Sequence, residues 1–153
     1  MSHDFQEFSI STLFRFTEVG FLACDMGFPD QALAIFSALA IVQPGIPHHL
    51  MNKAIVHGRY GRLDHATKLL FSLLENFPDS QIVKAILGLL LVQQQDARAL
   101  HYLDEVLNGA ADKDAVAVAQ SCYDLACQLR DNQTFKPALD DLQFFRHHNN
   151  RLL

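Results

Sequence analysis

Apolar side chains recur along this chain at the spacing of an α-helix. Two segments show the pattern well: Ala32, Leu33, Phe36 and Leu39, then Ala66, Leu69, Leu70, Leu73 and Leu74. This spacing places the apolar residues on one face of a helix, which turns about once every 3.6 residues. No segment alternates apolar and polar residues for long enough to predict a β-strand. We therefore expect an all-α fold.

The helical pattern repeats at a separation of 34 residues. The residues that match at this separation are Gly27 and Gly61, Asp30 and Asp64, Ala32 and Ala66, Leu39 and Leu73, and Pro44 and Pro78. Each glycine is expected to take the left-handed conformation that ends a helix, and each aspartate to cap the next helix. Each proline stops the second helix, because proline lacks the amide hydrogen and clashes with the preceding turn. Each copy is thus predicted to be a helical hairpin.

Small residues recur where the two helices of each hairpin would cross. They are Gly20, Ala54 and Gly88 on the first helices, and Ala32, Ala66 and Ala99 on the second helices. In the third copy the turn is one residue shorter, and Asp96 stands where the earlier copies have glycine. A helix-turn-helix unit of this length, with small crossing residues and a closing proline, resembles the tetratricopeptide repeat.

This resemblance implies a short right-handed solenoid of about three to four repeats, with capping helices at both ends. We expect one domain over residues 1–153, with repeats at about 13–46, 47–80 and 81–108 and a degenerate copy at 119–148. Phe5, Phe8 and Ile10 precede the first repeat, where we expect them either to cap it or to dimerise.

The first helix of each repeat lines the concave face of such a solenoid, so the resemblance also indicates residues that would contact a partner. They are Phe14, Thr17, Phe21, His48, Met51, Ile55, Arg59, Ile82, Leu89, Val92 and Tyr123. Most are apolar, and an exposed apolar strip of this length predicts a binding site for a hydrophobic segment. Two other interpretations stay open: the same residues belong to an ordinary core, or they form a dimer interface.

Charge and composition narrow the range of partners. The 153 residues are 50% hydrophobic and carry 12 Lys and Arg against 17 Asp and Glu, for a net charge of −5. Phosphate binding rests on clustered Lys and Arg, so nucleic acid is not an expected partner. The longest apolar run, Ala85 to Val92, is too short for a transmembrane helix of about 20 residues. Because the N-terminal segment is acidic and does not resemble a secretory signal, we expect a soluble cytoplasmic protein.

Catalytic and metal-binding motifs are weak in this sequence. The three cysteines form no CxxC pair, and the eight histidines show neither HExxH nor zinc-ligand spacing. His65 and His101 form the one conceivable metal pair, and Asp112 and Asp114 are expected to be solvated. Because no phosphate-binding loop or nucleophile motif occurs either, we expect no enzyme activity, no cofactor and no metal.

A small acidic solenoid with an apolar groove is similar to the dedicated chaperones of bacterial type III secretion systems. The similarity covers residues about 10–107 and rests on size, the three-repeat layout and small crossing pairs such as Gly20 with Ala32 and Ala54 with Ala66. It implies a cytoplasmic protein of a bacterial virulence apparatus. Such a protein would hold a hydrophobic helical or extended segment of a secretion substrate or apparatus subunit and prevent premature self-association.

The resemblance further implies that Arg59 pairs with an acid on this client. If the apolar strip is instead a dimer interface, the expected state of the client-free protein is a homodimer. The alternative is a general tetratricopeptide scaffold that joins proteins of an unrelated complex. A scaffold would bind a partner that is already soluble, whereas a chaperone would solubilise its client.

Overall fold

A computed structural model describes residues 8–109 and 112–131 of the chain. It contains α1 (Ile10–Asp25), α2 (Pro29–Val42), α3 (Pro47–Arg59), α4 (Leu63–Asn76), α5 (Gln81–Gln93), α6 (Arg98–Gly109) and α7 (Lys113–Asp131). No strand occurs in these residues. The expectation of an all-α fold is therefore confirmed for the described part of the chain.

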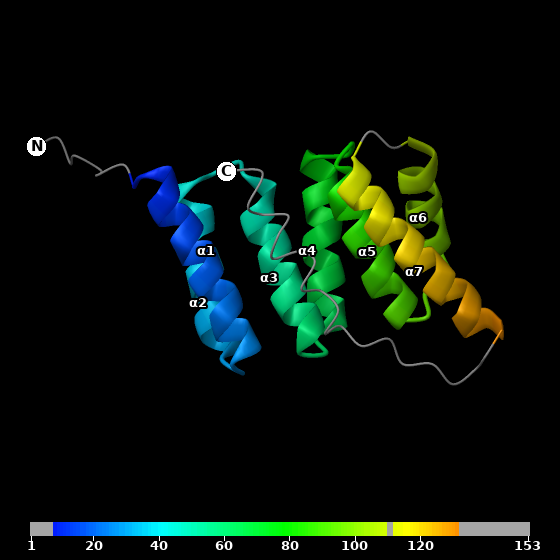
Figure 1. The fold of residues 1–153 in the computed structure, drawn as a ribbon, viewed down its shortest axis with the longest axis horizontal. Coiled ribbons are helices and arrows are strands. Elements are labelled where there is room, and N and C mark those ends of the chain that lie inside the picture. Colours follow the sequence, from blue (N-terminus) through cyan, green and yellow to red (C-terminus); the bar gives the residue numbers. More distant parts are fainter. Residues whose placement is uncertain (1–7, 110–111, 132–153) are drawn as a thin grey trace, which may run out of the picture.

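The helices form a row of hairpins (Figure 1). Helix α1 packs on α2, α3 on α4, and α5 on α6, and successive hairpins meet where α2 contacts α3 and where α4 contacts α5. Helix α7 closes the other end of the row by packing on both α5 and α6. The first hairpin and α7 therefore occupy opposite ends of the molecule (Figure 1).

The turns inside the first two hairpins have the predicted backbone conformation. Gly27 and Gly61 have positive φ angles of 87° and 73°, which an L-residue with a side chain adopts only at a cost. In the third hairpin the left-handed position is taken by Gln95, with φ 57°. Asp96 then follows, and its carboxylate accepts hydrogen bonds from the backbone amide and the guanidinium of Arg98.

The predicted caps are wrong by two residues. Asp30 and Asp64 lie within the first turns of α2 and α4, and the cap positions are held by Phe28 and Arg62, which make no capping side-chain hydrogen bond. Both carboxylates are still favourably placed, because the N-terminal end of a helix carries partial positive charge.

The expected close crossings are confirmed. A Cβ atom on Gly20 would lie 2.7 Å from Cζ of Phe36, which is fully buried on α2, and a Cβ atom on Gly88 would collide with Leu103 on α6. The facing small residues Ala32, Ala66 and Ala99 are all buried. Small side chains therefore let the helices of the first and third hairpins approach closely, and in the second hairpin Ala54 and Ala66 are both fully buried.

Helix α5 is the most buried element of the row. It contacts α4, α6 and α7, and its buried residues are Ile82, Val83, Ala85, Ile86, Leu87, Gly88, Leu90, Leu91 and Val92. A helix that is apolar on all sides is typical of the centre of a packed structure. Throughout residues 8–109 and 112–131, no helix combines the length and the apolar character needed to cross a membrane.

The region expected to hold a degenerate fourth repeat begins with one long helix. Helix α7 starts at Lys113, and the carboxylate of Asp112 accepts hydrogen bonds from the backbone amides of Asp114 and Ala115, at 3.0 and 3.2 Å. Asp112 therefore caps a helix. Residues 132–148 of the expected copy lie outside the described residues.

Candidate protein-binding surfaces

The structure places most of the predicted contact residues in the interior. Six of the eleven are buried, with exposed fractions of 1–7%: Thr17, Phe21, Met51, Ile55, Ile82 and Val92. Phe21 packs edge-on against Phe36 of α2, with ring centroids 5.1 Å apart, and the Thr17 hydroxyl donates to the carbonyl oxygen of Leu13 at 3.2 Å. The apolar strip predicted from α1, α3 and α5 is thus largely part of the packing between helices.

The other five predicted contact residues are partly exposed. They are Phe14, His48, Arg59, Leu89 and Tyr123, and we call them the odd-helix set because they come from α1, α3, α5 and α7. All four helices contribute at least one member. A partner could contact these five predicted residues without any rearrangement of the core.

Arg59 also joins the first two hairpins. Its guanidinium donates to the carboxylate of Asp25 at the end of α1, and the neighbouring Tyr60 hydroxyl donates to the carbonyl oxygen of Cys24 at 2.6 Å. Two polar contacts therefore tie the C-terminal end of α3 to the C-terminal end of α1. The expected pairing of Arg59 with an acid on a partner would have to share or replace the Asp25 contact.

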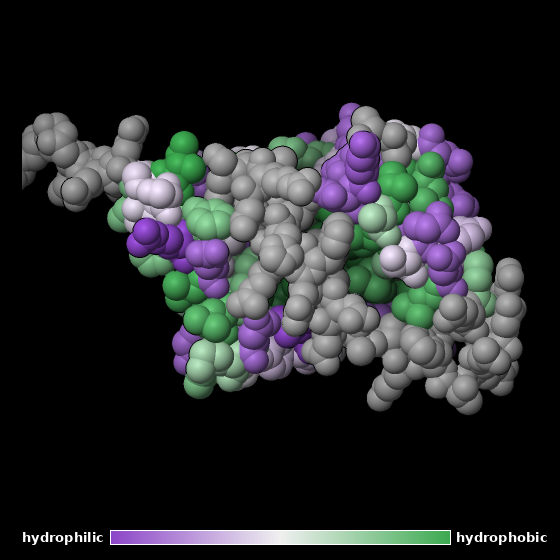
Figure 2. Space-filling view, in the orientation of Figure 1, coloured by the Kyte–Doolittle hydropathy of each residue, from purple (hydrophilic) through white to green (hydrophobic). Residues whose placement is uncertain are grey.

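A second apolar surface lies on the first hairpin, and the sequence interpretation identified only its edge, at Phe8 and Ile10. Eleven large apolar side chains are at least 38% exposed in the described part of the chain, and nine of them lie between residues 8 and 42. We call these nine the first-hairpin patch: Phe8, Ile10, Phe16, Val19, Leu22, Met26, Phe28, Ile41 and Val42. Figure 2 shows green apolar residues at this end of the molecule, with purple hydrophilic residues between them.

Helix α1 is apolar on two opposite sides. Leu13, Thr17, Phe21 and Cys24 face the interior, whereas Phe16, Val19, Leu22 and Met26 are exposed at the same three- and four-residue spacing. This second stripe was the signal in the sequence that could have identified the first-hairpin patch. A surface helix packs one apolar face on the protein core and exposes its polar face to water. A helix with two apolar faces needs a second packing partner to cover the other one.

An apolar groove runs between α1 and α2 within this patch. It has a volume of about 360 Å³ and is lined by Phe8, Leu13, Phe16, Ala34, Ile35, Ala38, Leu39 and Val42. Ala34 and Ala38 are four residues apart on α2 and are exposed. Their small side chains keep the groove open to a side chain or a helix from outside.

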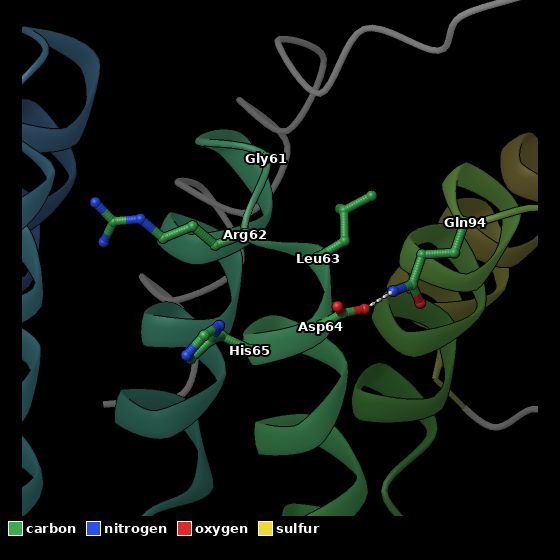
Figure 3. A pocket seen from close by; sticks show the side chains of 6 residues that line it. All are labelled: Gly61, Arg62, Leu63, Asp64, His65 and Gln94. Atoms are coloured by element: carbon green, nitrogen blue, oxygen red, sulfur yellow. Dashed lines mark hydrogen bonds between the residues drawn. The ribbon is translucent and has the colours of Figure 1, made fainter.

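A polar hollow lies beside the turn between α3 and α4 (Figure 3). Gly61, Arg62, Leu63, Asp64, His65 and Gln94 line about 490 Å³. Gln94 donates to the carboxylate of Asp64 at 2.8 Å, and the side chains of Arg62 and His65 point away from this pair (Figure 3). The side chains of Asp64, Arg62 and His65 therefore do not converge on one point in this hollow, whereas the groups of a catalytic site do.

Three side chains, His57, Cys24 and Cys122, have pKa values shifted toward their neutral forms. Burial, and then the nearby Arg62, His65 and Lys53, lower the pKa of His57, whose ring stacks on that of His65 at 5.6 Å. Burial raises the pKa of the Cys24 thiol and raises that of Cys122 to about 12. Both thiols are poor nucleophiles in this state. Among the described residues, no three His, Cys, Asp or Glu side chains are grouped as metal ligands.

Comparison with known proteins supplies the functional context. Residues 4–125 match the sequence model of a family described as bacterial type III secretion protein, HrpB1_HrpK. No curated protein and no solved structure matches the chain. The matched residues include the whole first hairpin and every member of the odd-helix set. Because the match extends over well more than half of its length, the chain belongs to the HrpB1_HrpK family of bacterial type III secretion proteins.

Proposed function

We propose that this protein is a chaperone of a type III secretion system, which binds a hydrophobic segment of a secretion substrate or apparatus subunit. Family membership supports the secretion context. The observation that carries the binding role is the odd-helix set, since α1, α3, α5 and α7 each contribute a partly exposed side chain from the predicted contact residues. The role requires binding alone and no catalysis.

The proposed scaffold is a tetratricopeptide-like right-handed solenoid. Three features support it: the serial packing of the hairpins, the left-handed glycines in two of their turns, and the small residues where paired helices cross. In such a solenoid the odd-numbered helices line the concave side, so the odd-helix set would form one continuous track across it.

Sequestration follows from the chemistry of this track. Phe14, Leu89 and Tyr123 offer apolar contact, and burying the client's apolar face removes the surface through which client molecules self-associate. A client held as a short segment also stays largely unfolded, which suits export. Because Arg59 is already paired with Asp25, apolar contacts rather than charge would provide most of the affinity.

The proposal places the protein in the cytoplasm, where a client is available before export. Fractionation of the bacterium tests this part separately. Recovery of the protein with cytoplasmic markers is expected, and recovery from the periplasm would contradict a pre-export chaperone and favour a role in the assembled apparatus.

Co-expression tests the function directly. The chain would be produced together with each small substrate or apparatus protein of its own secretion system, and the soluble fraction would be examined by size-exclusion chromatography with light scattering. A client that is insoluble alone should become soluble as a complex of fixed stoichiometry. If the chain binds only partners that are already soluble, the scaffold alternative is correct.

Matched variants locate the contact surface. Leu89→Glu combined with Tyr123→Glu should abolish the complex, because two carboxylates would lie on the apolar track. Leu100→Glu is the control, since Leu100 is an exposed apolar residue of the even-numbered helix α6. Equal loss of the client with both variants, at unchanged helical content, would show that the odd-helix set is not the contact surface.

A further inference from the structure

We propose that the first-hairpin patch is the surface through which two copies of this chain associate. The inference does not depend on the chaperone function, since it concerns the protein without any client. It rests on the place of the first hairpin in the row, on the apolar area that it exposes, and on the distribution of charge along α1.

The first hairpin stands at an end of the row and contacts the next hairpin mainly through the packing of α2 on α3. Arg59, Tyr60 and Arg62 add polar contacts to it. End units of stacked helical hairpins normally carry polar outer faces, because no further unit covers them. Here the outer side of α1 instead carries Phe16, Val19, Leu22 and Met26, all about half exposed or more. Within the described residues, the first hairpin therefore has the surface of an internal unit rather than of an end.

The exposed area is sufficient for a stable dimer. The nine side chains of the patch are 46–80% exposed, which leaves on the order of 800 Å² of apolar surface if each side chain presents about 150–200 Å² in full. A standard protein interface buries about 800 Å² from each partner. The patch also greatly exceeds the scattered apolar exposure of the other helices, where Tyr60 and Leu100 are the remaining large exposed apolar residues in the described part.

Charge is scarce around the patch, as it is in the centres of interfaces. Residues 10–42 contain four charged side chains: Arg15, Glu18, Asp25 and Asp30. Arg15 lies on the exposed stripe of α1, one helical turn before Val19. It is the one basic residue of this hairpin.

An antiparallel arrangement of the two α1 helices fits these residues. With the two-fold axis between Val19 and Leu22, Val19 of each copy meets Leu22 of the other, and Arg15 meets the end of the other helix at Asp25 and Met26. The Arg15 guanidinium then shares the Asp25 carboxylate with Arg59 of the other copy, while its aliphatic part packs on the Met26 thioether. A parallel arrangement would place the two Arg15 side chains together, which like charge disfavours.

Sedimentation velocity of the purified full-length chain tests the proposal. We expect a species of about twice the 17.2 kDa chain mass at micromolar concentration, in keeping with the two-fold symmetry common among oligomers. Val19→Glu and, separately, Leu22→Ser should weaken the dimer at least about 100-fold with unchanged circular dichroism, since both side chains are about half exposed. Leu100→Glu should dimerise like the wild type.

Two results would overturn the inference. One is a wild-type chain that remains monomeric at about 100 μM, far above the concentration at which an interface of this size should associate. The other is that the Val19→Glu variant and the Leu22→Ser variant both dimerise as tightly as the Leu100→Glu control. The dimer contact would then lie on another surface.

Cysteine trapping then tests the orientation. A mixture of Val19→Cys and Leu22→Cys chains should form a mixed disulfide faster than either chain alone, because the antiparallel arrangement brings these two positions together. If Val19→Cys chains cross-link only with one another, the proposed register is wrong.

Discussion

Helices α2 and α5 have almost the same apolar content and opposite environments. Ten of the 14 residues of α2 and nine of the 13 residues of α5 are Ala, Val, Ile, Leu or Phe. Yet three residues of α2 are buried, against nine of α5. The difference lies in position, since α5 is enclosed by α4, α6 and α7 whereas α2 belongs to the end hairpin. The apolar content of a helix therefore predicts how much of its surface favours burial. The position of the helix in the row decides how much of that surface other helices of the same chain cover.

The same charged substitution should separate the two environments most strongly. Ile86→Glu on α5 is expected to unfold the protein, with a loss of more than about 4 kcal/mol, because it buries a carboxylate without a partner. Ile41→Glu on α2, at a site 80% exposed, should change the free energy of unfolding by less than about 0.5 kcal/mol. Urea unfolding in dilute protein measures both, and similar losses would contradict the assigned environments.

The turns of the first and third hairpins should differ in the same way, with a smaller effect on the free energy of unfolding. Gly27→Ala in the first hairpin should cost about 1–2 kcal/mol, because it puts a side chain on a left-handed residue. Gln95→Gly in the third hairpin should stabilise the protein by up to about 1 kcal/mol, since glycine removes the strain that Gln95 carries at φ 57°. Thermal unfolding of the two variants should therefore shift in opposite directions. A destabilised Gln95→Gly chain would mean that the side chain makes a compensating contact.

The smallest expected effect concerns how the first hairpin is attached. Tyr60→Phe removes the hydroxyl that donates to the Cys24 carbonyl oxygen and should cost about 0.5–1.5 kcal/mol. Hydrogen exchange should show faster opening of α1 than of α5, since the lost bond joins α3 to α1. Uniform acceleration over all helices would instead indicate that the row unfolds as one unit.

Local features of the fold could be predicted from the sequence because they depend on nearby residues. Gly27 and Gly61 end their helices as expected, and Gly20 and Gly88 lie at close crossings. The 34-residue repeat and the small size of glycine suffice to predict such features. Asp30 was misplaced as a cap by the same local reasoning, because Pro29 already begins α2 ahead of it.

Exposure could not be predicted in the same way. Phe21 and Val19 lie on different faces of α1 and are both apolar, and the sequence does not state which face meets α2. The structure buries Phe21 against Phe36 and leaves Val19 about half exposed. The variant Phe21→Glu with Ile55→Glu should accordingly disrupt the fold and not only client binding, because both side chains are buried.

The serial order of the helices also has a consequence for folding kinetics. The main packing partners of every helix are its immediate neighbours along the chain, with the addition of α7 on α5. Contacts of such short sequence separation close small loops, and proteins dominated by them fold within microseconds to milliseconds. Helix α5 sits at the centre of this network, so its apolar side chains can collapse onto α4 and α6 as soon as these segments form. A row built in this way can therefore acquire structure progressively, from its buried centre toward the first hairpin.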